Sequence, residues 1–363
     1  MRIRARHALV ALLAAALLAP AAAEGAWVIK GRGFGHGVGL SQYGAYGYAQ
    51  HGRNYKQILG HYYRKTKVAK GRSGRVRVLL GTQGSVGFTN AESACGRDVN
   101  PSKDYSFALS GSSVSLLGPN DSKLRSCGNE GRAKGGRTIS ITGSGRYRGD
   151  LVARANGDSL MVINSVGAEG YVKGVVANEM PSSWHQQALR AQAVAARSYG
   201  LATKRSGAFD HYDDTRSQVY GGRDSETKAT NKAVKRTKRK VVKHKGKIAT
   251  TYYFSTSGGE TENSQFGFGG GSSLPYLKSV NDPYDDISPV HKWMVNYSNS
   301  QMESRLKALF QGTLKRIQIL DTGRSPRIVR AKVVGSSGST TVTGDTLRNR
   351  LGLRSTWAKF TKN

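Results

Sequence analysis

Glu179 is a carboxylate whose neighbours in the sequence could let it act as a general acid. It lies in the stretch VVANEMPSSWHQQALRAQAVAARSYG, between the apolar residues Val175, Val176 and Met180. An apolar setting removes water from a carboxyl group and raises its pKa, whereas the N-terminus of a following helix lowers it. A general acid and an ordinary structural Glu are both consistent with these residues alone.

A glycine-rich stretch near the start of the chain, GRGFGHGVGLSQYGAYGYA (Gly31–Ala49), could carry further polar contacts. Such glycines allow tight turns and a close approach of the backbone to a ligand. A nucleotide site is excluded because the GK[ST] ending and a long preceding apolar strand are missing. His36, Ser41 and Gln42 would then offer hydrogen bonds to a ligand near Glu179. The alternative is a glycine-rich turn in which His36 satisfies a neighbouring backbone group.

Helices and strands must hold these residues in place. Residues 166–205 give the strongest helical signal, with Pro181 ending one element and Ser182 or Ser183 predicted to cap the next. The many alanines of this second helix allow close packing. A shorter helix is expected in NYKQILGHYYRKT, and a short apolar strand at Trp27–Ile29.

The remaining segments favour strands. Residues 75–165 alternate apolar and polar residues between Gly and Ser. The basic residues 225–247 fit a helix followed by a strand, whose charges form either a solvated face or a contact with an anionic polymer. Residues 248–290 are expected to be a β-rich run that becomes a Gly/Ser loop. Residues 300–363 are expected to hold a small helix and the strands RIQILD and RIVRAKVVG.

The N-terminus and the charge indicate export. Residues 1–23 combine three arginines, a short apolar run and Ala21–Ala23, which predicts a secretory signal peptide cleaved near Ala23; an uncleaved anchor is the alternative. No other segment is long enough to span a membrane. The chain carries a net charge of +33. The abundant polyanions outside a bacterium are wall polymers and lipid head groups, so nucleic acid is not expected. Cys95 and Cys127 are expected to form a disulfide, and no metal site is expected.

Several motifs resemble the SpoIID/LytB family over most of the chain after residue 23. They are NSVGAEGYVKGVVANEMPSSWHQQALRAQAVAARSYGL, DDTRSQVYGG (Asp213–Gly222), YYFSTSGGETEN (Tyr252–Asn263), LPYLKSVNDPYD (Leu274–Asp285), LGLRST (Leu351–Thr356), GHGVGLSQYGA (Gly35–Ala45) and ILGHYY (Ile58–Tyr63). The strand-rich region that contains the two cysteines is the part that resembles the family least.

The resemblance implies a peptidoglycan lytic transglycosylase that leaves a 1,6-anhydro end, with Glu179 as the catalytic acid. One carboxyl suits this reaction, because retaining and inverting glycosidases both need a second one. No cofactor is implied. The expected partners are glycan strands, anionic wall polymers and a wall amidase. The alternative function is a non-catalytic wall-binding protein that stimulates an amidase, as the enhancer branch of the family suggests.

On this resemblance, His36, Ser41 and Gln42 would bind glycan hydroxyl or acetamido groups near Glu179. Further polar residues fall on these motifs, and each has a structural alternative. Arg197 would orient Glu179 or the substrate, or form a structural salt bridge. Ser257, Gly258 and Gly259 would contact acetamido groups, or form a tight turn. Gln218 and Tyr220 would line the groove, although a core role for Tyr220 is equally consistent with the sequence.

Two departures from the family pattern matter. Some relatives bind zinc near the segment of His211, but this segment has no Cys, so no zinc is expected. The GHG motif usually follows the segment that matches LGLRST, whereas here it comes first, which indicates a circular permutation. The strand at Trp27–Ile29 should therefore lie beside a C-terminal strand near Trp357–Phe360.

The expected fold is a single compact assembly of the mixed α/β (α+β) class. Its strands are largely antiparallel, and the alanine-rich helix lies beside the cleft. The expected division is a signal peptide (1–23), a GHG-motif segment (24–74), a strand-rich subdomain with the disulfide (75–158) and the main catalytic core (159–363).

Overall fold

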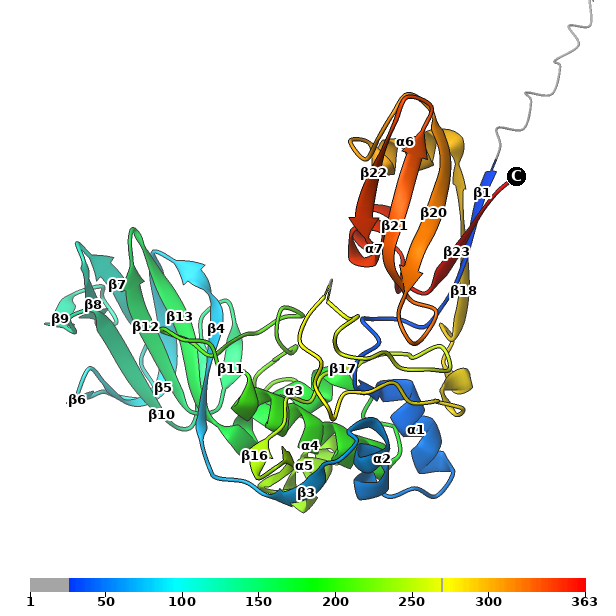
Figure 1. The fold of residues 1–363 in the computed structure, drawn as a ribbon. Helices are drawn as coiled ribbons and strands as arrows, with labels where there is room; N and C mark the ends of the chain where they lie inside the picture. Colours follow the sequence, from blue (N-terminus) through cyan, green and yellow to red (C-terminus); the bar gives the residue numbers. More distant parts are fainter. Residues whose placement is uncertain (1–25, 269) are drawn as a thin grey trace, which may run out of the picture.

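The computed structural model describes residues 26–268 and 270–363, so the expected signal peptide lies outside the described residues. The fold is mixed α+β with mostly antiparallel strands, as expected. Figure 1 shows three units in a row: a strand-rich unit (residues 75–167), a helical unit in the middle and a terminal unit built from residues 26–32 and 292–362. The molecule is therefore extended, and the expectation of a compact assembly was wrong.

The strand-rich unit is one large sheet whose residues alternate between buried and exposed, as in β5. The strands run in the order β14-β4-β13-β12-β10-β5-β7-β8-β9, with β6 and β11 paired at the side. Their bounds are β4 (Arg75–Gln83), β5 (Ser85–Ala94), β6 (Arg97–Asp98), β7 (Tyr105–Ser110), β8 (Ser113–Leu117), β9 (Lys123–Ser126), β10 (Glu130–Ile141), β11 (Gly145–Tyr147), β12 (Asp150–Asn156), β13 (Ser159–Gly167) and β14 (His211–Tyr212). A disulfide between Cys95 and Cys127 joins the ends of β5 and β9.

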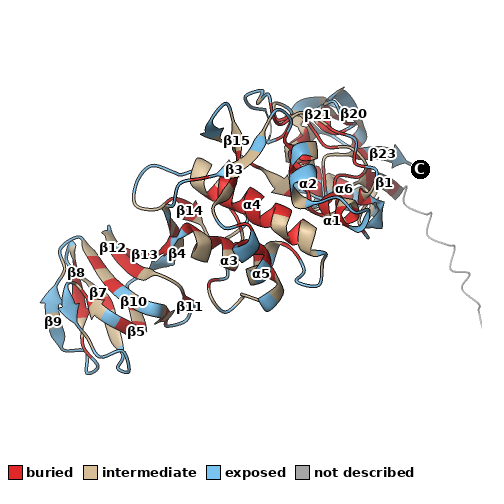
Figure 2. Cartoon of the chain, turned by 90° about the horizontal axis from the view of Figure 1, so that it is seen from below, coloured by how far each residue is buried: buried red, intermediate tan, exposed pale blue. Residues whose placement is uncertain are grey.

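The helical unit is organised around α4 (Gln186–Ala202), which is almost entirely buried (Figure 2). Alanine side chains let α1 (Gln42–Gln50), α2 (Tyr55–Tyr62), α3 (Ala168–Glu179) and α5 (Lys228–Arg236) all contact it. Two short sheets complete the unit: β3 (Lys67–Lys70) with β15 (Lys240–His244) and β16 (Lys247–Ile248), and β2 (Leu40–Ser41) with β17 (Tyr253–Phe254).

The expected cap of α4 was wrong. Ser182 and Ser183 lie exposed in a turn, and α4 begins after His185, whose Nδ1 accepts a hydrogen bond from the Gln187 backbone N–H at 3.3 Å. Ser182 and Ser183 lie in the turn after Pro181, before the chain becomes helical. The imidazole of His185 therefore accepts one of the free backbone N–H groups of the first turn of α4, that of Gln187.

Residues 248–290 contain much less strand than expected. Their strands are limited to the end of β16 and to β17, and the short 3-10 helix η1 (Asp285–Ile287) follows. Buried carboxylates and hydroxyls bind the backbone here in place of a strand ladder. Glu262, for example, accepts hydrogen bonds from the backbone N–H groups of Asn263, Arg324 and Ser325.

The terminal unit has its own hydrophobic core, separate from the core of the other two units. Its first sheet places β1 (Ala26–Arg32) between β18 (Lys292–Ser298) and β23 (Ala358–Lys362), both antiparallel to it. The second sheet and two helices comprise β19 (Phe310–Gln311), β20 (Leu314–Thr322), β21 (Ile328–Gly335), β22 (Gly338–Thr343), α6 (Asn299–Leu306) and α7 (Gly344–Leu351). The expected residue block 159–363 thus contributes to two hydrophobic cores.

The pairing of β1 with β23 confirms the predicted neighbourhood of the two ends of the chain. Ile29 lies opposite Phe360, and Trp27 lies opposite Lys362. Figure 1 shows β1 and β23 side by side. This adjacency is the geometry that a circular permutation requires.

Candidate functional site

Glu179 is the last residue of α3, and its carboxyl group is held by two neutral groups. Oε1 accepts the backbone N–H of Val219 at 3.0 Å, and Oε2 accepts Nε2 of Gln42 at 3.3 Å. The same Gln42 amide also donates to the backbone carbonyl of Glu179 at 3.0 Å. Gln42, predicted as a site residue, therefore contacts the predicted acid directly.

Burial raises the pKa of the Glu179 carboxyl above its ordinary value, although the hydrogen bonds from Val219 and Gln42 oppose the shift. The N-terminus of the next helix does not lower the pKa of Glu179 as expected, because α4 starts only at Gln186. Glu179 lies instead at the C-terminal end of α3, where the helix dipole disfavours a negative charge. The environment thus favours the protonated form that a general acid needs.

Behind Glu179 lies a chain of buried hydrogen bonds. Tyr253 donates its hydroxyl to Oε1 of Gln218 at 2.7 Å, and Nε2 of Gln218 donates to the hydroxyl of Tyr171 at 2.7 Å. Burial, followed by the charge of Glu179, raises the pKa of the Tyr253 phenol well above its ordinary value. Gln218 is buried, so it supports Tyr253 and Val219 and does not line a groove.

Tyr220 also belongs to the interior. It is buried, and its hydroxyl donates to Oδ1 of Asn164 at 2.8 Å. Of the two roles considered for Tyr220, the core role is the one that the structure contains.

Three half-buried aromatic rings pack together and lie close to Glu179 or Gln42 in the sequence; they were not predicted as site residues. Tyr46 stacks on Trp184 with ring centroids 4.7 Å apart, and Tyr43 meets the same indole edge-on at 4.8 Å. Trp184 follows Glu179 by five residues, and Tyr43 follows Gln42 directly on α1. Rings of this kind are suited to stacking on sugars, and the repeated Tyr of SQYGAYGYA was the available signal.

Both ring nitrogens of His36 form hydrogen bonds with the protein backbone. Its Nε2 lies 3.0 Å from the carbonyl of Tyr253, and its Nδ1 accepts the N–H of Val38 at 3.1 Å. These partners fix the tautomer with the proton on Nε2. Burial lowers the pKa of the His36 imidazole to about 3, so the ring is neutral. The sugar-binding role predicted for His36 was wrong, and the alternative of a glycine-rich turn describes it.

The glycines of the same stretch approach protein groups closely. Gly39 has φ of +82°, and a Cβ there would lie 2.1 Å from the carbonyl oxygen of Tyr252; a Cβ on Gly37 would lie 2.3 Å from Nε of Arg327. These glycines therefore let the loop pack against the 250s segment and against the terminal unit.

The carboxylate of Asp285 accepts hydrogen bonds from polar groups of Ser41, Ser257 and Gly258. Its Oδ1 accepts the Ser41 hydroxyl at 2.7 Å and the Ser257 N–H at 2.8 Å, and its Oδ2 accepts the Gly258 N–H at 2.9 Å. Ser41 also caps α1 by accepting the Gly44 N–H. Both serines are fully buried, so their predicted contacts with substrate were wrong.

Gly259 completes this tight turn, since its N–H donates to Oγ of Ser257 at 3.1 Å. The turn has φ of +80° at Gly258 and +112° at Gly259, values that favour glycine. The tight-turn alternative thus describes all three residues.

Arg197 does not reach Glu179. Its Nε and Nη2 bind the two carboxylate oxygens of Glu169 at 2.9 and 2.8 Å, and its Nη1 donates to the carbonyls of Ala193 and Lys240. Glu169 lies ten residues before Glu179 on α3, which is roughly 15 Å along the helix axis. Arg197 is therefore the structural salt bridge considered above, and its predicted orienting role was wrong.

His211 is buried, with its Nε2 3.0 Å from the carbonyl of Gly200 and its ring stacked near Tyr171. Within residues 26–268 and 270–363, no group of three or more His, Cys, Asp or Glu side chains is arranged to hold a metal ion. In the same part of the chain, no helix has the length and apolar character needed to cross a bilayer.

Asp282, beside this site, should make stability depend on pH. Burial, followed by the charge of Asp285, raises the pKa of the Asp282 carboxyl to about 7. Because the pKa of Asp282 is higher in the folded protein than in the unfolded chain, protonation of this group stabilises the fold. The stabilisation is fully present below the unfolded-state pKa near 4 and is lost as pH rises to 7. The parent should therefore lose about 2–3 kcal/mol between pH 5 and pH 8 through this group. We expect Asp282→Asn to be more stable than the parent at pH 8 and to lose that advantage towards pH 5.

Urea unfolding at pH 5, 6.5 and 8 measures this gap, and groups shared by both proteins cancel in the difference. Asp286→Asn is the control, because that neighbouring side chain is exposed. A gap between the Asp282→Asn protein and the parent that stays constant with pH would show that Asp282 is ionised throughout.

Comparisons with known proteins identify the segment that contains this site. Residues 156–244 match the family model described as Stage II sporulation protein. The chain is 43% identical over 134 residues to the Amidase enhancer of Bacillus subtilis, which covers 37% of this chain and 18% of that protein. It is 30% identical over 221 residues to the Stage II sporulation protein D of Bacillus subtilis, which covers 55% of this chain and 62% of that protein.

An uncharacterized protein of Brachyspira hyodysenteriae is 37% identical over 138 residues, which are 37% of each chain. Each of these matches spans less than two thirds of the relative's length. The family model nevertheless covers α3, Glu179, α4, α5 and β15 without a break. This segment is therefore similar to the SpoIID/LytB family, in agreement with its motifs.

Proposed function

We propose that the protein is an exported peptidoglycan lytic transglycosylase in which Glu179 is the single acid and base. The observation that carries the proposal is the half-buried Glu179 carboxyl, which has a raised pKa and is held by the neutral groups Gln42 and Val219. The packed aromatic rings of Tyr43, Tyr46 and Trp184, which follow Gln42 and Glu179 closely in the chain, suit a sugar chain.

The geometry supports a specific position for the catalytic proton. The Val219 N–H bond at 3.0 Å keeps Oε1 as an acceptor, so the proton belongs on Oε2, where the Gln42 contact is longer at 3.3 Å. The acid then gives this proton to the glycosidic oxygen as the bond from C1 of N-acetylmuramic acid to that oxygen breaks. The 6-hydroxyl of the same sugar attacks C1 and returns its proton to Glu179, so no water is consumed.

Export is supported by the disulfide between Cys95 and Cys127, which suits an oxidising environment, and by the signal-like residues 1–23. A location at the cell wall is also supported by the relatives named for sporulation and for amidase enhancement.

Mass spectrometry of the products of purified glycan strands tests the proposal. We expect 1,6-anhydro-muramyl ends, with no incorporation of oxygen from ¹⁸O-labelled water. Products that carry ¹⁸O would indicate hydrolysis, and intact strands would indicate a protein without this activity.

The 43% identity to a protein named Amidase enhancer favours one alternative, a non-catalytic protein that stimulates a wall amidase. Under that alternative, Glu179→Gln would stimulate the amidase as well as the parent does. Under the proposed function, glycan cleavage by the protein alone depends on Glu179.

A further inference from the structure

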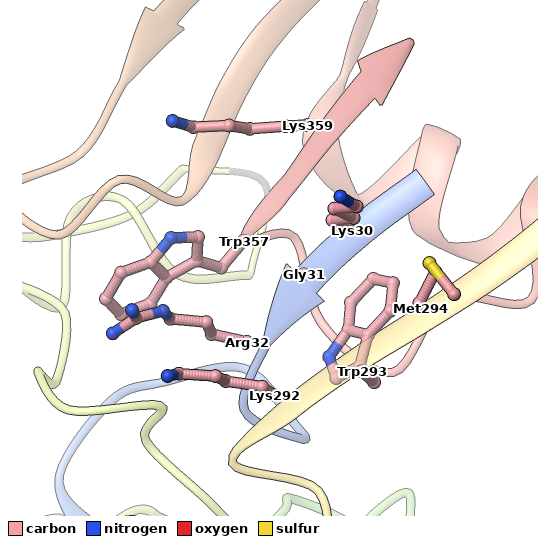
Figure 3. A pocket seen from close by; sticks show the side chains of 8 residues that line it. All are labelled: Lys30, Gly31, Arg32, Lys292, Trp293, Met294, Trp357 and Lys359. Carbon is pink, nitrogen blue, oxygen red and sulfur yellow. The ribbon is translucent and has the colours of Figure 1, made fainter. Parts of the chain in front are cut away.

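The outward face of the β18-β1-β23 sheet forms a basic groove with a volume of about 500 Å³ (Figure 3). The strand registers place Lys30 between Met294 and Lys359, and Arg32 next to Lys292. The opposite face of the sheet carries Trp27, Ile29 and other apolar residues into the core of the terminal unit. Because strands alternate, the basic residues are all directed outward.

The cations of this groove are not neutralised by acids. Its lining contains Lys30, Arg32, Lys292 and Lys359 but no acidic side chain. Among the residues that the structure describes, these four cations take part in none of the salt bridges. Lys30, Lys292 and Lys359 are exposed, so they are available to an external anion.

The arrangement suits a chain of repeated charges better than a single ion. The four cations are spread over three neighbouring strands, about 5 Å apart, and do not converge on one buried point. Arg32 is held in place by Trp357, because its guanidinium carbon lies 5.6 Å from the ring centroid. Figure 3 shows Lys292 and Lys359 on either side of this pair.

The residues that line the groove also favour one class of polyanion over the others. It offers no side-chain amide or hydroxyl that could recognise a neutral sugar, which disfavours the glycan strand itself. Nucleic acid bases would need a free aromatic face. Trp293 is only 9% exposed, and the ring of Trp357 has both Arg32 and Arg327 within 6 Å of its centroid. Met294 is 58% exposed and provides one apolar contact for an aliphatic backbone, which is little for insertion into a membrane.

We propose that this groove binds a linear polyol-phosphate polymer, with phosphodiesters on the four cations and the aliphatic backbone along Met294. The binding is independent of the reaction at Glu179. It would hold the protein in a wall that contains such a polymer while the helical unit meets the glycan.

Isothermal titration of synthetic poly(glycerol phosphate) into the full chain tests the proposal. The variant Lys30→Gln/Lys292→Gln/Lys359→Gln should bind at least about tenfold more weakly and with a shallower salt dependence, because three phosphate contacts are lost. The substituted side chains are exposed, so the melting temperature should not change.

The control variant Lys232→Gln/Lys235→Gln/Lys238→Gln removes the same charge from exposed positions on and after α5, and it should bind like the parent. Glu179→Gln should also bind like the parent, which separates this proposal from the proposed function. Equal losses in the two lysine variants would show that only net charge matters and would overturn the proposal. Groove-dependent binding that is tighter to single-stranded DNA or to phosphatidylglycerol vesicles than to the polymer would also overturn it.

Discussion

Glu179→Gln is expected to lower kcat for glycan cleavage by a factor on the order of 10³, without loss of the fold. The amide has the shape of the acid, and its oxygen can still accept the Val219 N–H. The variant cannot deliver a proton to the leaving oxygen. Release of anhydro-muramyl products measures the loss, and the melting temperature reports folding.

The pH dependence should identify the acid. Since burial raises the pKa of the Glu179 carboxyl, kcat of the parent should fall as pH rises through that raised value, and the residual activity of the Glu179→Gln variant should lack this limb. Glu130→Gln is the control, because this carboxylate lies in the strand-rich unit with 37% of its side chain exposed. A Glu179→Gln protein with the rate and pH profile of the parent would exclude Glu179 as the acid.

Arg197→Met is expected to destabilise the protein by about 3 kcal/mol or more, because it breaks a buried bidentate ion pair. The Arg197 side chain is 1% exposed and also donates to two backbone carbonyls. Glu169 keeps 31% of its side chain in solvent, which holds the expected loss near the lower end of the range for buried pairs. Urea unfolding at pH 7 measures the change in the free energy of unfolding.

The matched control is Arg216→Met. Arg216 also binds a carboxylate, that of Asp214, through two of its nitrogens, but its side chain is 60% exposed. Exposed pairs are screened by solvent and contribute little to stability, so this change should be small. At a temperature where the Arg197→Met protein remains folded, its kcat should stay within about twofold of the parent. If the Arg197→Met protein kept its stability but lost its activity, Arg197 would have a role in catalysis.

Patterns within a short stretch of sequence predicted the fold well. The alanine periodicity of α4, the alternating strands of residues 75–165 and the helix-to-strand change in residues 225–247 all depend on neighbours in the sequence. The pairing of β1 with β23 was predicted because displaced motifs constrain where the chain ends can lie. Glu179 could be predicted as the candidate acid from its motif and from its apolar neighbours in the sequence.

The site residues that were predicted wrongly share one physical cause. The polar groups of Ser41, Ser257 and His36 are satisfied by partners that the fold brings together, and two of these partners are more than 200 residues distant from the group they bind. A sequence motif shows which polar groups exist but not which of them are already occupied. Trp184 was missed for the converse reason, since only the fold brings α1 against it.

The central place of β1 in its sheet has a consequence for the order of folding. Trp27 and Lys362 face one another across the sheet although 335 positions separate them in the numbering. A contact between such distant residues has a large loop-closure entropy and forms late, after local contacts have reduced the effective loop. During vectorial synthesis, β1 emerges before both of its partner strands, β18 and β23. The terminal unit is therefore the last to assemble, and until then β1 leaves an unpaired edge that an early-binding chaperone can recognise.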